Sequence, residues 1–241
     1  MRTRQSFLAL AVAVSFLFLF HPPAHAQETV DIKGVKAALL KPRREPVGSL
    51  VLLAGGDGDI GVGTKGQIAR QGNQLVRTRQ AYVAKGFAVL VPDRGVDVAA
   101  AVDYMANIKR PVTLVGTSRG TLRAAAGIAF GAKPDALVVT SGFLSPQSGE
   151  AVNRHLIRIV GTPAHLPQTL VIHHRRDACA YTSPAGVQPF IDWSQSRAKI
   201  VWLDGGRSQG DPCGPFAYHG FNGIDARVVD AVVKFANEKS N

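Results

Sequence analysis

The sequence predicts an α/β fold in which a mostly parallel sheet carries helices on both faces. Strand-like and helix-like segments alternate from residue 49 onward, and such alternation is typical of parallel sheets. The strand-like segments are runs of Val, Leu and Ile without polar alternation, as expected of strands that are buried on both faces. No repeat, low-complexity tract or linker interrupts the 241 residues, so one domain is expected.

Six buried strands are expected, each an apolar run bounded by turn residues. They span residues 50–54, 87–91, 112–115, 136–139, 170–172 and 200–203. Helices are expected at residues 67–84, 96–108, 119–130, 184–195 and 224–237. The last of these is amphipathic, with an apolar face made by Val228, Val229, Val232, Val233 and Phe235. Residues 29–40 are expected to add one or two antiparallel edge strands.

The first 26 residues have the pattern of a secretory signal peptide. Arg2 and Arg4 precede an uncharged apolar run, residues 6–20, and Ala24-His25-Ala26 has the small-x-small form of a cleavage site. The run is shorter than the roughly 18 residues that a membrane anchor needs. We therefore expect cleavage after Ala26, a mature domain of residues 27–241 that is periplasmic or secreted, and no stable membrane insertion after cleavage.

A nucleophile motif stands where one expected strand meets the next helix. Gly116-Thr117-Ser118-Arg119-Gly120 follows the strand at 112–115 directly, and Gly-x-Ser-x-Gly at such a junction is the pattern of a nucleophile elbow. Small residues on both sides permit a tight turn that presents the serine Oγ at a helix N-terminus. Backbone N–H groups there can face a forming oxyanion. Ser118 is therefore the candidate nucleophile.

A serine hydroxyl is nearly un-ionised at neutral pH, so it needs a base, and the base needs an acid to orient it. Asp177 follows the expected strand around residue 172, and His219 lies in a loop before the last helix. Asp204 ends the next expected strand and stays open as a second candidate acid. We favour Asp177, since the order Ser118, Asp177, His219 matches the known chain order of such triads.

On these residues the sequence resembles the α/β-hydrolases, most closely the small, lid-poor esterases and dienelactone-hydrolase-like members, with serine in place of cysteine. The resemblance covers residues 49–241 and implies a single-domain α/β-hydrolase fold. It implies Ser118 as nucleophile, His219 as general base and acid, and Asp177 as the residue that orients His219. No cofactor and no metal are implied.

The resemblance also implies an oxyanion hole. One donor would be the N–H of Arg119, and a second would come from the loop after the strand at 50–54, where Gly56 and Asp57 are the candidates. Many esterases carry a His-Gly-Gly pattern in this loop. Ala54 takes the place of that histidine here, so the second donor stays open between Gly56 and Asp57.

The two cysteines, Cys179 and Cys213, are expected to form a disulfide because the chain is expected to be exported. Cys179 lies just after Asp177, and Cys213 lies shortly before His219. A bridge would tie the acid loop to the base loop and contribute about 3–4 kcal/mol in the chain-entropy treatment.

Gly56, Gly58 and Gly61 match a dinucleotide-binding fingerprint, Gly-x-Gly-x-x-Gly. We disfavour that interpretation for two reasons. Asp57 and Asp59 would lie beside a pyrophosphate, and the helix that the fingerprint requires does not begin at Gly61.

The net charge of +11 is spread along the chain rather than clustered. Basic residues are not interleaved with aromatic ones, so a nucleic-acid partner is not expected. The excess charge suits either a basic surface facing an anionic envelope or the attraction of a carboxylate- or phosphate-bearing ester. Arg119 is the residue that we expect at the mouth of the site in the second case.

The expected activity is hydrolysis of carboxylic esters by an exported serine hydrolase, with thioesters, amides and acyl transfer left open. About thirty residues separate the strands at 136–139 and 170–172, too few for a large lid domain. The alternative is a hydrolase-fold protein that no longer catalyses and binds an anionic ligand or partner.

Overall fold

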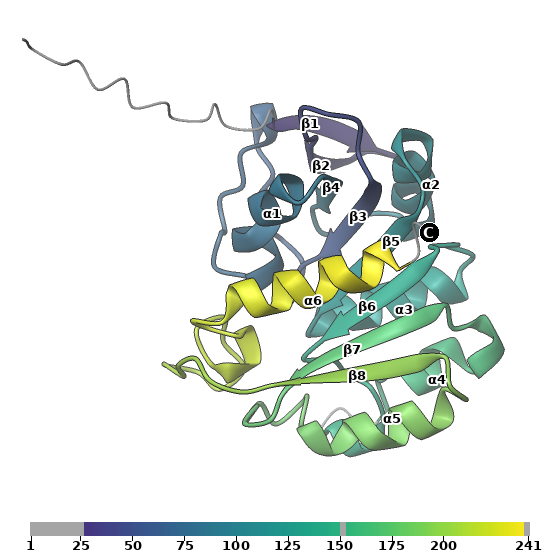
Figure 1. The fold of residues 1–241 in the computed structure, drawn as a ribbon, viewed down its shortest axis with the longest axis vertical. Helices are drawn as coiled ribbons and strands as arrows, with labels where there is room; N and C mark the ends of the chain where they lie inside the picture. The colour runs from purple at the N-terminus through teal and green to yellow at the C-terminus, as the bar shows by residue number, and fades with distance from the viewer. Residues whose placement is uncertain (1–26, 150–152, 239–241) are drawn as a thin grey trace, which may run out of the picture.

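Eight strands form one sheet in the order β1-β2-β4-β3-β5-β6-β7-β8 (Figure 1). The computed structural model describes residues 27–149 and 153–238, so the predicted signal peptide lies outside the described residues. From β4 across to β8 all neighbours run parallel, whereas β2 pairs antiparallel with both β1 and β4. The strands are β1 (Gln27–Ile32), β2 (Val35–Leu40), β3 (Gly48–Leu53), β4 (Phe87–Pro92), β5 (Val112–Thr117), β6 (Ala136–Thr140), β7 (Gln168–His174) and β8 (Ala198–Leu203). The predicted mostly parallel sheet is confirmed.

All six predicted strands are present, and most extend slightly beyond their apolar runs. The strand at 200–203 is not buried on both faces as expected, because β8 lies at the sheet edge and residues 200–202 are half-buried. β7 continues through His173 and His174, which pair with Trp202 and Leu203 of β8. Polar residues at a strand end can still contribute their backbone groups to the ladder, which is why apolar runs alone underestimate strand length. Residues 29–40 fall in the antiparallel hairpin of β1 and β2, of which β1 is the edge strand and β2 lies between β1 and β4.

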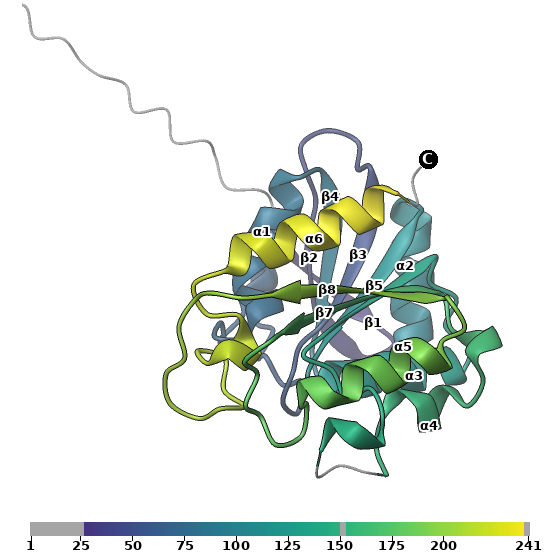
Figure 2. The same cartoon turned by 60° about the horizontal axis from the view of Figure 1, so that its bottom comes forward.

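Helices cover both faces of the sheet (Figure 2). α1 (Gln74–Ala84) and α6 (Asp225–Asn237) pack on one face, whereas α2 (Val98–Ile108), α3 (Arg119–Ala129) and α5 (Val187–Trp193) pack on the other. Within β3, Leu50 and Leu52 belong to the first core, and Val51 and Leu53 belong to the second. Successive strand residues point to opposite faces, so a strand covered on both sides must be apolar throughout.

The first predicted helix, residues 67–84, was wrong at its start, since α1 begins only at Gln74. The side chain of Asn73 accepts the N–H of Leu75 as an N-cap, so the helix begins directly after Asn73. Ile68 pairs instead with Val62 in an isolated antiparallel bridge. No helix follows Gly61 directly, which agrees with the rejection of the dinucleotide fingerprint.

The connection from β6 to β7 contains only short helical segments in its described part: η2 (Pro146–Ser148), α4 (Leu156–Val160) and η3 (Pro163–His165). α4 contributes Leu156 and Val160 to the core that it shares with α3, so this connection packs onto the fold. Two further single turns, η1 (Thr64–Gly66) and η4 (Pro184–Gly186), precede α1 and α5. Across residues 27–149 and 153–238, no helix is long and apolar enough to cross a membrane.

Candidate active site

Ser118 occupies the sharp turn between β5 and α3, with φ = 52° and ψ = −124°. A positive φ is uncommon for a residue with a side chain and marks local strain. Two glycines make the turn sterically accessible. A Cβ on Gly116 would lie 2.7 Å from Gly120 O, and a Cβ on Gly120 would overlap Leu53 O. The turn therefore has the geometry that the Gly-x-Ser-x-Gly pattern requires.

The three residues expected at an oxyanion hole lie next to Ser118. Arg119 is the first residue of α3, so its N–H has no acceptor within the helix. The loop after β3 approaches the serine so closely that a Cβ on Gly55 would lie 3.1 Å from Ser118 Cβ. Gly56, at φ = 60°, and Asp57 follow in this loop and line the same cavity as Ser118.

Arg123, one turn after the serine on α3, braces that loop. Its guanidinium donates to Gly56 O at 3.2 Å and to Ala54 O, and burial lowers the pKa of this arginine. In a trans peptide, such as the one between Gly56 and Asp57, the C=O and N–H bonds point in opposite directions. The contact with Gly56 O therefore fixes the direction of the Asp57 N–H as well.

His219 and Asp177 form a buried pair. His219 Nδ1 lies 3.0 Å from Asp177 Oδ2, and the two residues are 4 % and 6 % exposed. A carboxylate only accepts hydrogen bonds, so the proton between them belongs on Nδ1, which leaves Nε2 as an acceptor. It is Asp177, and not the open alternative Asp204, that lies against His219. Asp204 is instead exposed and pairs with Arg175 at 3.2 Å.

Asp177 has further donors around it. Cys179 N donates to Oδ1 at 3.0 Å, and Thr182 Oγ1 lies 3.2 Å from Oδ2 and 3.0 Å from His219 Nδ1. His173 Nε2 lies 3.5 Å from the same Oδ2. Burial lowers the pKa of His173 to about 4, so this ring is neutral beside the carboxylate.

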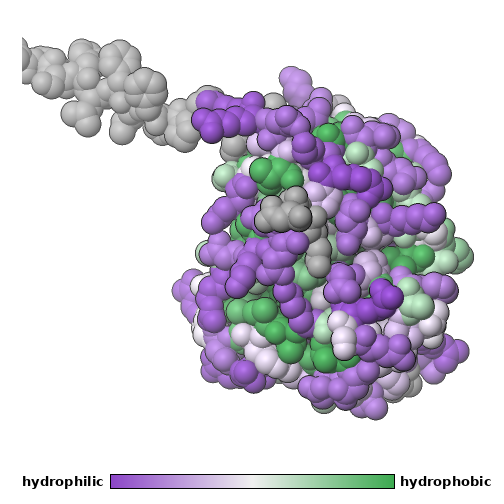
Figure 3. Space-filling view, turned by 45° about the vertical axis from the view of Figure 1, so that its right-hand side comes forward, coloured by the Kyte–Doolittle hydropathy of each residue, from purple (hydrophilic) through white to green (hydrophobic). Residues whose placement is uncertain are grey.

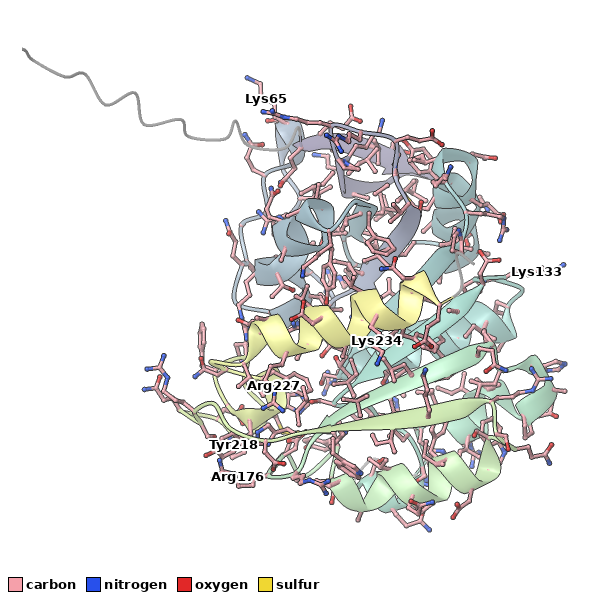
Figure 4. The ribbon with its side chains drawn as sticks, in the orientation of Figure 1. Lys65, Lys133, Arg176, Tyr218, Arg227 and Lys234 are labelled. Atoms are coloured by element: carbon pink, nitrogen blue, oxygen red, sulfur yellow. A yellow bond between two sulfur atoms is a disulfide. The ribbon has the colours of Figure 1, made fainter. Side chains whose placement is uncertain are left out.

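The loop that carries His219 is fixed on several sides. Ser141 Oγ donates to His219 O at 2.7 Å. Tyr218, in the turn η5 (Tyr218–Gly220), stacks on His174 at 4.5 Å between ring centroids and lies under the Arg176 guanidinium at 4.3 Å. Figure 4 shows Arg176 and Tyr218 side by side at this corner of the molecule. His173 and His174 thus face opposite sides of β7, one toward Asp177 and the other toward Tyr218.

A disulfide joins Cys179 and Cys213, as expected, with 4.5 Å between their Cα atoms. Cys179 is 3 % exposed and lies two residues after Asp177, while Cys213 lines the cavity that contains Ser118 and His219. The bridge therefore links the two loops that carry Asp177 and His219.

Arg77 on α1 donates to five acceptor atoms, of which two lie in the loop that carries His219 and two belong to Asp225, the first residue of α6. They are Gly72 O at 2.6 Å, Pro215 O at 3.1 Å, Gly220 O at 2.7 Å, and Asp225 Oδ1 and Oδ2 at 2.8 and 2.9 Å. Two of these acceptors flank His219 in sequence. The planar guanidinium satisfies them together because its donors are arranged as a fork.

A cavity of about 350 Å³ brings Ser118 and His219 together. Gly56, Asp57 and Asn73 also line it. Its charged lining includes Asp59 and Arg70, which pair with each other. Among the described residues, no group of three or more His, Cys, Asp or Glu side chains is placed to hold a metal ion.

Arg119 is not among the residues that line that cavity. It lines a second hollow of about 410 Å³, which shares Gly56 and Asp57 with the first. Arg123 and Arg154 line this hollow as well. The sequence predicts Arg119 at the mouth of the catalytic pocket, whereas the residue lines this neighbouring hollow together with two further arginines and Asp57. Elsewhere polar side chains dominate the face seen in Figure 3, where hydrophobic ones form small separate patches.

Three polar residues of the site were not predicted from the sequence, and of these Thr182 and Arg77 carry no recognisable sequence signal. Thr182 reaches Asp177 and His219 from the turn after the cysteine, Arg77 lies in an ordinary helix, and Asn73 carries only the signature of a helix cap. An Asn that precedes an apolar helix predicts a cap, and that signal, if followed, would have found the true start of α1.

No protein-family model matches the sequence, and no curated protein matches it. Solved structures do resemble the fold. An esterase/lipase from an uncultured bacterium has a TM-score of 0.59 at 15% identity, with 90% of this chain and 86% of that chain covered. A carboxyl esterase from the fungus Tuber melanosporum has 0.62 at 12%, covering 91% and 88%. A dienelactone hydrolase from Anabaena variabilis has 0.60 at 14%, covering 87% and 97%. The chain therefore has the α/β-hydrolase fold.

Proposed function

From the α/β-hydrolase fold and the geometry of the cavity, we propose that the protein is an exported serine hydrolase that cleaves carboxylic esters. The observation that carries the proposal is one cavity lined by both a strained serine at a helix N-terminus and a histidine bonded to a buried aspartate. Resemblance to structures described as esterases supports the same reaction class.

In the proposed reaction Ser118 is the nucleophile, His219 the base, and Asp177 the residue that orients His219. Nε2 of His219 takes the hydroxyl proton as Oγ bonds to the ester carbonyl carbon. The carbon–oxygen bond to the alcohol then breaks, and the same proton passes to the leaving alcohol. Water repeats the sequence on the acyl-enzyme: His219 takes its proton, the hydroxyl bonds to the acyl carbon, and Ser118 leaves and recovers the proton.

The oxyanion of each tetrahedral intermediate would be bound by the N–H of Arg119 and by an N–H of the Gly56–Asp57 segment. Fixed donors aimed at developing charge contribute strongly to catalysis because they need no reorganisation during the reaction. Arg123 supports this role, since its bonds to Ala54 O and Gly56 O hold the loop in one conformation. Thioesters, amides and transfer to other alcohols would use the same groups.

The substrate class that we favour is an ester with a carboxylate or phosphate on its acyl part. Three arginines, Arg119, Arg123 and Arg154, and one carboxylate, Asp57, line the hollow next to the expected oxyanion donors. An acyl chain that passes Gly56 would bring an anionic end into this hollow, where positive charge is in excess. Arg119→Ala should raise KM for acidic esters and leave KM for neutral esters of equal length unchanged. An equal change for both kinds of ester would argue against the anionic class.

The proposal is tested by the hydrolysis of short p-nitrophenyl esters. We expect turnover by the purified mature protein and a loss of about 10³-fold or more in kcat for Ser118→Ala and for His219→Ala. Wild-type turnover no faster than that of Ser118→Ala would favour the non-catalytic alternative, in which the fold binds an anionic ligand or partner.

Export is part of the proposal and is supported by the disulfide, because such bonds persist in oxidising compartments. Expression of the full-length chain followed by mass spectrometry of the exported protein should give a mature chain that begins at Gln27. A protein that stays in the cytoplasm with Met1 retained would contradict this part.

A further inference from the structure

Asn73 stands at the edge of the cavity with its side-chain amide held in one orientation. Its Oδ1 accepts the N–H of Leu75 at 3.1 Å as the N-cap of α1. Because the oxygen is engaged by the helix, the nitrogen Nδ2 must point the other way. On that side, a Cβ on Gly55 would lie 3.2 Å from Asn73 Nδ2 and 3.1 Å from Ser118 Cβ. The amide nitrogen and the serine therefore flank the same point.

The amide is also fixed through the backbone. Asn73 O accepts the N–H of Arg77 at 2.9 Å, and the Arg77 guanidinium bonds to Gly72 O just before it. In the part of the chain that the structure describes, Nδ2 donates to no protein acceptor, although Asn73 lines the cavity with Ser118 and His219. An oriented donor without a protein acceptor beside a nucleophile is available to the substrate.

We propose that Asn73 is a further catalytic residue, whose Nδ2–H donates to the carbonyl oxygen of the substrate as it becomes the oxyanion. It would act together with the backbone N–H groups of Arg119 and of the Gly56–Asp57 segment. The inference rests on the proposed function and adds a side-chain donor to it. A side-chain donor differs from a backbone donor in one practical respect, since substitution removes it without changing the turn at Ser118.

The cap and the donor can be separated by mutation. Serine and aspartate cap helices as well as asparagine does, but serine lacks the amide nitrogen, and an ionised aspartate has no N–H to donate and places negative charge near the oxyanion. Asn73→Ser should therefore melt close to wild type yet lose about 100-fold in kcat, the usual cost of one oxyanion donor, with little change in KM. Asn73→Asp should lose more.

A matched control is Asp97, the N-cap of α2, whose side chain accepts the N–H of Ala100 at 3.0 Å. It caps a helix of the same length as α1, 11 residues, and lines a different hollow from Ser118. Asp97→Ala and Asn73→Ala each remove a cap and should lower the melting temperature, but only Asn73→Ala should lower kcat.

Wild-type kcat in Asn73→Ser or Asn73→Asp would overturn the inference, because it would leave only a capping role. Ester hydrolysis by the wild-type protein is measured in the same assay. If the wild type itself showed no hydrolysis, the proposed function would fail and the inference with it, so the two failures are distinguishable.

Discussion

Arg77→Lys should lower both the melting temperature and kcat, because Arg77 joins α1 to both sides of the loop that carries His219. A lysine ammonium keeps the charge but has a single nitrogen, which cannot reach five acceptors spread over a guanidinium fork. The bonds at risk are those to Pro215 O and Gly220 O, at 3.1 and 2.7 Å. Lysine can retain part of the ion pair with Asp225.

The size of the effect follows from the contacts that are lost. Hydrogen bonds to a charged group contribute about 1.5–3 kcal/mol each when buried. The Arg77 and Asp225 side chains are 19% and 35% exposed, so solvent screens part of this value. Two lost carbonyl bonds then destabilise the fold by about 3 kcal/mol, which corresponds to a fall of about 6–12 °C in Tm for a chain of this size. Misplacement of His219 should lower kcat about 10-fold or more.

Thermal unfolding by circular dichroism and kcat on a p-nitrophenyl ester measure the two effects. Arg110→Lys is the matched control, since Arg110 pairs with Asp135 at 2.7 Å but is 51% exposed, and an exposed pair contributes at most about 1 kcal/mol. If Arg77→Lys matched Arg110→Lys in both Tm and kcat, the Arg77 bonds to Pro215 O and Gly220 O would not stabilise the loop that carries His219.

Three further effects are expected. Reducing the Cys179–Cys213 bridge should cost about 4 kcal/mol of unfolding free energy and lower activity, and an unchanged Tm and rate in dithiothreitol would exclude this. Thr182→Val should reduce kcat about 10-fold through loss of its bond to Asp177. A wild-type kcat in this variant would show that Thr182 does not contribute to catalysis. Burial lowers the pKa of His173 to about 4. As pH falls, this histidine is therefore protonated in the unfolded chain at a higher pH than in the folded protein. The free energy of unfolding, measured by urea titration, should fall by up to about 3 kcal/mol between about pH 6.5 and 4. An equally large fall in His173→Phe over the same pH range would contradict this.

Much of the fold follows from local sequence patterns. The strands are runs of β-branched and aliphatic residues, and the strain at Ser118 is encoded by two glycines whose absent Cβ atoms leave room for Gly120 O and Leu53 O. The loops that carry Ser118 and Asp177 lie at the same edge because the carboxyl ends of parallel strands meet there, whereas the expected order of acid and base along the chain comes from the family resemblance. These features depend on contacts between near neighbours or on topology, both of which a single sequence carries.

Other features depend on side chains that meet across large sequence separations. Arg77 reaches Gly220 over 143 residues, and Thr182 reaches His219 over 37, and neither pairing leaves a local pattern. The position of Arg119 shows the same limit, because its place next to Ser118 in sequence does not determine which of two adjoining hollows the residue lines. The late start of α1 is different, since Gly72 and the capping residue Asn73 are a local signal that marks where the helix begins.

The proposed reaction requires that Ser118 is a nucleophile activated by His219. The most direct measurement is labelling of the mature, oxidised protein with a fluorophosphonate, followed by mass spectrometry to map the adduct. A stoichiometric adduct on Ser118 that is lost in His219→Ala, with both proteins folded and disulfide-bonded, is the predicted result. A folded wild-type protein that forms no adduct, or an adduct on Ser118 that persists in His219→Ala, would contradict it.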